Sequence, residues 1–156
     1  MEKEYKKNLE DEIDWKIIDQ LHAATISFSN SSLELKKLFF VLIGISVPSL
    51  IKLAGDKVDL SLFVSVYILT ITFWLLDSYT YYYQEKLRQR MNSHFSDIRK
   101  RNIQAVLDPE GDTIELYRNS KGRLVRSLFN FSLILYLFIF SINTLGVVLY
   151  LTDVVK

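Results

Sequence analysis

An arginine and a histidine six positions apart are the residues of this chain whose types could carry out a reaction. Arg88 and His94 lie in the charged stretch "EKLRQRMNSHF". A histidine exchanges protons near neutral pH and an arginine binds phosphate, so such a pair could act on a phosphate ester. On a continuous helix these side chains point about 120° apart, whereas Arg90 and His94 share a face. Arg88 and His94 are the catalytic candidates if the chain is an enzyme.

Other reactive arrangements are missing from the sequence. The chain has no cysteine, which excludes disulfides, a thiolate nucleophile and a cysteine-based zinc site. Asp14, Asp19 and His22 fall in a helical pattern without a second histidine, and we interpret them as a solvated helix face. The alternating carboxylates of 108–112 lack the rest of a calcium-binding loop. We therefore expect no metal, no cofactor and no enzymatic activity.

Three apolar blocks determine the elements that would position these residues. Apolar residues make up 49% of the chain, and the formal net charge is only +1. The first block is apolar over 38–51 and is flanked by lysines, and the other two are uncharged over 60–76 and 128–151. A helix that crosses a bilayer needs about 20 apolar residues. The blocks predict three membrane spans, and a soluble helical bundle is the alternative.

The predicted fold is an all-α membrane protein. The stretch "SFSNSSLE" would interrupt or cap an N-terminal helix, with Ser31 and Glu34 as a capping box. No helix breaker follows the second block until Asp108-Pro109, so the second span should extend into the cytoplasm as a long helix. The expected segments are an N-terminal cytoplasmic helix (1–32), spans at 33–54, 58–77 and 127–152, and a cytoplasmic segment (78–126) with a small hairpin near 112–126 as an option.

The distribution of basic residues predicts the orientation of the spans. Six lysines and arginines precede the first block and ten lie in 77–127, against one in the loop 54–59 and one in the tail 152–156. Cytoplasmic loops of membrane proteins are enriched in these residues. We therefore expect the N-terminus and the long middle segment in the cytoplasm, and the C-terminus outside.

Tyrosines and basic residues crowd the end of the second block. Amphipathic rings favour the membrane surface, and basic side chains bind anionic headgroups. Lys36 and Lys37, at the start of the first block, should likewise reach the headgroups along their methylene stems. The expected membrane-interface residues are Trp74, Asp77, Tyr79, Tyr81, Tyr82, Tyr83, Lys86, Arg88 and Arg90.

Polar and small side chains recur at helical spacing inside the second and third spans. Lipid offers polar groups no partner, so they must face protein or water. Two interpretations stay open: packing within one protomer, or contact between protomers with one stripe facing an aqueous lumen. In the second case the chain is a homo-oligomer in the lipid bilayer. The candidate oligomer-facing or pore-facing residues are Ser61, Ser65, Thr72, Ser132, Tyr136, Asn143 and Gly146.

An N-terminal helix, a membrane hairpin and a charged juxtamembrane helix with "FWLLDSYTYYYQEKLRQR" (73–90) resemble small bacterial antiviral membrane effectors. The accessory membrane pore proteins of type VI-B CRISPR systems and the SLATT two-span effectors share this layout, and the Arg88/His94 spacing is similar to that of HEPN ribonucleases. The resemblance implies an oligomeric pore in the bacterial inner membrane that depolarises the cell in phage defence. It implies a CRISPR or other defence-system protein as partner, and leaves RNA open. The alternatives are a membrane-anchored HEPN-like RNase and a non-catalytic membrane scaffold.

Overall fold

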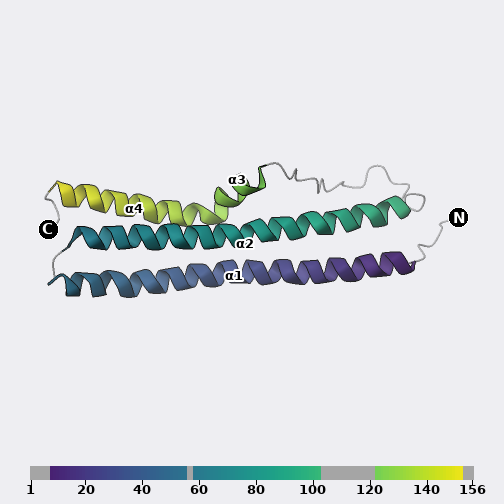
Figure 1. Cartoon of the computed structure of the whole chain (residues 1–156), viewed down its shortest axis with the longest axis horizontal. Coiled ribbons are helices and arrows are strands. Elements are labelled where there is room, and N and C mark those ends of the chain that lie inside the picture. The colour runs from purple at the N-terminus through teal and green to yellow at the C-terminus, as the bar shows by residue number, and fades with distance from the viewer. Residues whose placement is uncertain (1–7, 56–57, 103–121, 153–156) are drawn as a thin grey trace.

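The computed structural model describes residues 8–55, 58–102 and 122–152, and within these ranges every element is a helix. Two long helices run antiparallel along the whole molecule, and a third, shorter helix lies along one end of the second (Figure 1). The all-α prediction is thus confirmed for the described residues. In chain order the elements are α1 (Leu9–Leu53), α2 (Leu60–Arg101), α3 (Arg123–Leu128), the 3₁₀ turn η1 (Phe131–Leu133) and α4 (Ile134–Leu151).

Asparagine and aspartate side chains start the two long helices. The Asn8 side chain accepts hydrogen bonds from the Glu10 and Asp11 amides, at 2.6 and 3.1 Å. Asp59 accepts from the Leu60 amide at 2.7 Å. Such N-cap bonds satisfy donors that the helix itself leaves unpaired. The turn between the helices passes through Gly55 at a φ of 71°, where a side chain would be strained.

The predicted interruption of the first helix is not found, because α1 continues through "SFSNSSLE" to Leu53. The Ser31 hydroxyl is satisfied inside the helix, since Ser31 Oγ donates to the Ser27 carbonyl at 3.0 Å instead of capping a new start. Such back-bonding removes the competition that otherwise makes serine a helix breaker. One rod therefore joins the N-terminal region to the first apolar block.

The predicted cytoplasmic extension of the second span is confirmed as helix as far as Arg101. Its apolar stripe, the helically spaced residues Leu87, Met91, Phe95 and Ile98, lies on the part of α2 that packs against the N-terminal half of α1. The rings of Phe95 and Trp15 meet edge-on at 5.6 Å, and those of Tyr83 and Phe28 stack at 5.6 Å. We call this two-helix part, residues 9–31 of α1 and 78–101 of α2, the stalk.

The third apolar block does not form one helix, although it is uncharged throughout. Its first residue, Leu128, is the last residue of α3; the helix then breaks at Phe129 and Asn130 and becomes regular again only at Ile134. "RLVRS", the suggested second strand of a hairpin, lies at the start of this region and is helical; its partner "TIELY" lies outside the described residues. Hydropathy records which residues avoid water but not where the backbone bends.

Among the described residues, two helices are long and apolar enough to cross a membrane, α2 and α4, whose most apolar stretches of 18 residues have mean hydropathies of 1.8 and 2.1. The C-terminal part of α1 does not meet this criterion, because Lys36, Lys37 and Lys52 lie within or beside its apolar stretch. It nevertheless lies beside the apolar half of α2 (Figure 1).

The hydrophobic core lies where α1, α2 and α4 meet. Phe39 of α1 is fully buried between Phe73 of α2, at 5.4 Å between ring centres, and Tyr136 of α4, at 5.2 Å. Leu133 completes this buried cluster. Aromatic pairs at these separations add to the stability that burial provides.

Gly146 on α4 provides a test of this packing. A Cβ atom built there would lie 2.8 Å from Phe63 Cε1, whereas one at Gly44 would meet nothing within 4 Å. Overpacking a closed contact costs about 1–3 kcal/mol. Gly146→Ala should therefore lower the free energy of unfolding in detergent by about this amount, and Gly44→Ala should not lower it. Equal stability of the two variants would contradict the contact between α4 and α2.

Candidate functional site

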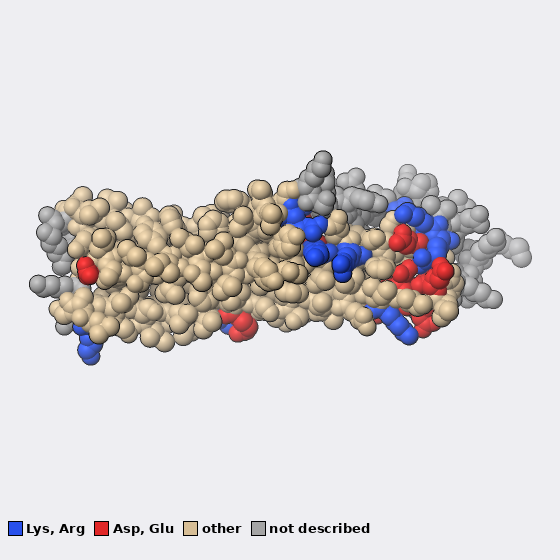
Figure 2. All heavy atoms as spheres, in the orientation of Figure 1, with Lys and Arg blue, Asp and Glu red and all other residues tan. Residues whose placement is uncertain are grey.

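Polar side chains are buried and large apolar side chains are exposed over the apolar half of the molecule. Of the residues of α4, only Tyr136 and Asn143 are buried. Phe138 and Leu145, in contrast, are 63% and 59% exposed. Figure 2 shows this half as a nearly uncharged surface, while charged side chains gather at the other end. A water-soluble protein buries the opposite set of residues.

A buried ion pair lies at the boundary between these two halves. Lys36 Nζ on α1 donates to Asp77 Oδ2 on α2 at 2.5 Å. The Asp77 side chain is 2% exposed and that of Lys36 is 16% exposed. Each charge lies one helical turn from the aromatic core, since Lys36 precedes Phe39 and Asp77 follows Phe73. The pair thereby fixes how α1 is placed along α2.

Further polar groups complete the surroundings of Asp77. Ser32 Oγ donates to Asp77 Oδ1, and Lys36 also donates to Ser32 Oγ at 2.7 Å. Thr80 Oγ1 donates to the Asp77 carbonyl at 2.8 Å. The Tyr136 hydroxyl, from α4, is buried near enough to Asp77 to interact with its charge, but it makes no well-formed hydrogen bond with any described residue. This cluster, which we call the boundary cluster, therefore contains residues of α1, α2 and α4.

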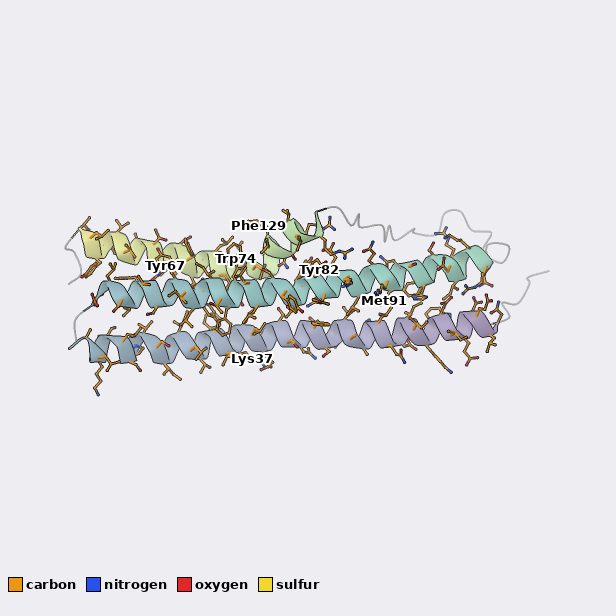
Figure 3. The ribbon with its side chains drawn as sticks, viewed as in Figure 1. Lys37, Tyr67, Trp74, Tyr82, Met91 and Phe129 are labelled. Atoms are coloured by element: carbon orange, nitrogen blue, oxygen red, sulfur yellow. The ribbon has the colours of Figure 1, made fainter. Side chains whose placement is uncertain are left out.

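The break between α3 and α4 is held against α2 by Trp74, which lies one helical turn before Asp77. Trp74 Nε1 donates to the Leu128 carbonyl at 3.1 Å, and the Trp74 ring meets Phe129 edge-on at 6.0 Å. Figure 3 shows Trp74 on the side of α2 that faces this break. The carbonyl that α3 leaves unpaired at its end thus finds a donor on α2.

Several expected membrane-interface residues have other positions in the structure. Asp77 and Lys36 pair with each other instead of reaching the headgroups, because each would otherwise be an isolated charge beside the hydrocarbon. Lys37 does point away from α2, as Figure 3 shows, and pairs with Glu34 at 2.6 Å on the surface. Trp74 is half-buried against α3, whereas Tyr79 is 58% exposed.

The other members of that group lie progressively further along the stalk. Tyr81 is half-buried, and Lys86 lies over the Tyr83 ring at 5.7 Å. The guanidinium of Arg123 lies over the Tyr82 ring at 5.6 Å. Arg88 and Arg90 lie about 16 and 20 Å beyond Asp77 along α2, in the stalk. Their placement at a membrane surface stays a prediction.

The predicted polar stripe of the third span faces α2 within the protomer. Asn143 Nδ2 donates to the Phe63 carbonyl at 3.0 Å, Tyr136 lies in the core, and Gly146 adjoins Phe63. These contacts agree with the first of the two interpretations left open by the sequence, packing within one protomer, because a buried carbonyl and a close helix contact involve these residues there. The side chain of Ser132 lies outside the described residues.

The corresponding residues of the second span remain on an open face. Ser61 and Thr72 are exposed and Ser65 is half-buried. Ser65 Oγ donates to the Ser61 carbonyl at 2.8 Å, and Ser61 Oγ donates to Asp59 at 2.9 Å. These hydroxyls need no partner from outside the helix. The face can therefore be covered without breaking a hydrogen bond.

Arg88 and His94 are not brought together within the protomer. His94 Nδ1 lies 2.8 Å from Asp14 Oδ1 on α1, and Arg88 lines a separate cavity. Asp14 was expected on a solvated face, so the sequence pattern did not reveal its role. The structure joins it instead to the end of α2.

A charged cluster fastens the tip of the stalk. Asp11 is fully buried and accepts from Arg101 Nε at 3.0 Å and from Asn102 Nδ2 at 2.9 Å. Arg101 also donates to Asp14. The hydrogen bond from Arg101, and secondly that from His94, lowers the pKa of Asp14, while the two aspartates raise the pKa of Arg101. The described residues contain no group of three or more side chains suited to hold a metal ion.

Comparison with protein-family models, with curated proteins and with solved structures gives no match to this chain. Sequence and geometry alone therefore carry the functional argument.

Removing one charge of the boundary cluster should be strongly destabilising. Lys36→Met leaves Asp77 buried without a counter-charge, which costs about 3–5 kcal/mol. Replacing both charges in Lys36→Met/Asp77→Leu should recover most of the loss. The matched control is Lys37→Met, whose exposed pair is worth less than about 1 kcal/mol. Unfolding measured by circular dichroism in detergent would decide, and additive losses in the double variant would refute the pairing.

The stability of the stalk tip should depend on pH through Asp14. Its pKa is lowered in the folded protein, so its contribution is present above the unfolded value of 3.8 and is lost as the pH falls through the folded value. Asp14→Asn should therefore flatten the acid side of the stability profile, measured by denaturant unfolding from pH 6 down to about pH 3. Asp19→Asn serves as the control, and an identical change in both variants would exclude the Asp14 contacts as the cause.

Proposed function

We propose that this protein inserts in the bacterial inner membrane, assembles into a homo-oligomer and permeabilises that membrane under the control of its cytoplasmic stalk. In this proposal α2, α4 and the C-terminal part of α1 cross the bilayer, with the N-terminus inside and the C-terminus outside. Antiviral defence, implied by the resemblance in sequence, is the setting we propose for this activity.

The observation that carries the proposal is the reversed burial pattern. Asn143, Thr70 and Asp77 are buried, whereas Phe138, Ile68 and Leu145 are exposed by more than half of their surface. Lipid favours this arrangement because it solvates apolar side chains and leaves polar groups to pair internally. Helices of about 27 Å, such as α4, match the thickness of the hydrocarbon.

The open face of α2 supports self-association. Ser61, Ser65, Ile68 and Thr72 form one stripe along the helix, opposite the face that packs on α1 and α4. Small residues let two membrane helices approach closely, and α2 is the central helix of the protomer. The outer face of α4 instead presents large side chains suited to lipid, such as Phe138 and Leu145. We therefore assign contacts between copies to the α2 stripe.

The boundary cluster gives the stalk a mechanical connection to the spans. α1 and α2 are continuous through the boundary, so neither helix offers a hinge there. The Lys36–Asp77 pair opposes sliding or rotation of one helix against the other. A signal that reorients the stalk would thus reach the open face of α2 and change how copies pack. This connection is the proposed means of control.

The assembly can be tested with single cysteines, because the chain has none of its own. Thr72→Cys and Ser61→Cys should form crosslinked dimers in liposomes. Leu145→Cys is the control at a similar depth, since Asn143 and Phe63 place this part of α4 beside the start of α2. Crosslinking that is as strong at Leu145 as at Ser61 would refute the assigned face.

Permeabilisation can be tested with a potential-sensitive dye in proteoliposomes. The wild type should dissipate an imposed potassium gradient, and Thr72→Trp, which overfills the α2 stripe, should slow this by about tenfold or more through weakened association. Phe138→Trp on the outer face of α4 is the matched control and should conduct like the wild type. A wild type that crosslinks but never dissipates the gradient would leave only the scaffold alternative.

A further inference from the structure

A cavity of about 540 Å³ lies in the stalk, where α1, α2 and α3 meet. This volume falls within the range of small-molecule sites, about 300–1,000 Å³. Apolar side chains and charged side chains of both signs share its walls, and the carboxylates are those of Asp19 and Glu85. Its lining includes Ile18, Met91 and Phe95 on the apolar side and His22, Arg88 and Arg123 on the basic side.

Two guanidinium groups at the cavity have no carboxylate partner among the described residues. Arg88 is exposed and makes no ion pair with them. Arg123 donates to the Gln89 side chain and lies over the Tyr82 ring at 5.6 Å, but it also meets no carboxylate there. Arginines so placed retain their capacity for two-point binding of a phosphate group.

Glu85, a buried acidic residue in the cavity wall, already has its negative charge paired with Arg126. Glu85 is 6% exposed and accepts from Arg126 Nη2 at 2.6 Å and Nε at 3.0 Å. Its other oxygen, Oε2, is buried and has no donor among the described residues, and neither does Arg123 Nε have an acceptor. A ligand with both acceptor oxygens and an O–H or N–H group could satisfy both atoms after a small side-chain movement.

The position of the cavity along α2 decides the source of the ligand. Its residues from Glu85 to Phe95 lie about 12–27 Å beyond Asp77 along the helix axis. The headgroup region extends only about 5–8 Å from the hydrocarbon. Lipid phosphates therefore do not reach Arg88, and the ligand must come from the cytosol.

We propose that the stalk cavity binds a small soluble phosphate-bearing molecule, held between the guanidinium groups of Arg88 and Arg123. Arg88 belongs to the stalk, whereas Arg123 belongs to α3, which leads through η1 into α4. A bound phosphate therefore ties the chain entering α4 to the stalk. The phosphate site rests only on the contacts of the cavity, whereas the choice of a cytosolic ligand and the effect on ion flux rest on the proposed function.

The binding can be measured by titration calorimetry on the full chain in nanodiscs of neutral lipid, with inorganic pyrophosphate as the probe. We expect binding below about 10 mM, weakened at least about tenfold in Arg88→Ala and in Arg123→Ala. Arg88 is exposed, so its substitution should leave the melting temperature unchanged. Arg90→Ala, on the same helix but outside the cavity, is the matched control and should bind pyrophosphate like the wild type.

Three results would overturn the inference: no binding to the wild type at about 10 mM, an equal loss in Arg90→Ala, or displacement of pyrophosphate by anionic lipid added to the nanodisc. The last result would make a headgroup the occupant. Calorimetry does not depend on conductance, so a protein that binds pyrophosphate but never conducts would refute the proposed function and keep this site.

Discussion

A polar group that faces lipid has no hydrogen-bond partner, and in the proposed membrane setting this constraint accounts for how α1, α2 and α4 pack. Most buried polar side chains in the apolar half are paired across or along a helix, and the Tyr136 hydroxyl is an exception. Asn143 meets the Phe63 carbonyl, Thr70 bonds back to Val66 at 2.7 Å, and Asp77 meets Lys36. Apolar contact alone would allow the helices to slide or rotate in lipid. These few polar contacts therefore select one arrangement among many of similar apolar area.

Two ion pairs, each with a buried carboxylate, connect the helices at and near the boundary. Lys36–Asp77 joins α1 to α2, and Arg126–Glu85 joins α2 to α3 two turns further along the stalk. α2 carries the acid in both pairs and is in contact with α1, α3, η1 and α4. A displacement of α2 along its axis would therefore strain both pairs at once. This makes α2 the element through which any change in the stalk has to pass.

The helical content and the long extension of α2 could be predicted from the sequence, because uncharged runs and the apolar stripe ending at Ile98 depend only on local spacing. The continuity of α1 could not, since serines both cap and continue helices and the outcome depends on where their hydroxyls bond. The boundary cluster left a weak signal: a lone acid and lysines at adjoining ends of two apolar blocks. To predict that Asp77 pairs with Lys36 and not with Lys37, one must know which face each helix turns toward the other. The same holds for Tyr136 and Asn143, whose helical face was evident but whose neighbour was not.

The dependence of Lys36 on Asp77 has a consequence for synthesis of the chain. A lysine near the hydrocarbon costs a lone helix up to about 3 kcal/mol on insertion, and α1 has a short apolar stretch to offset it. Asp77 leaves the ribosome some 41 residues later. The C-terminal part of α1 would therefore be poorly retained until α2 has followed, and the two helices would enter the bilayer together as one hairpin. The orientation of α1 and α2 in the membrane would then be set in a single step. α4 would insert afterwards, beside this hairpin.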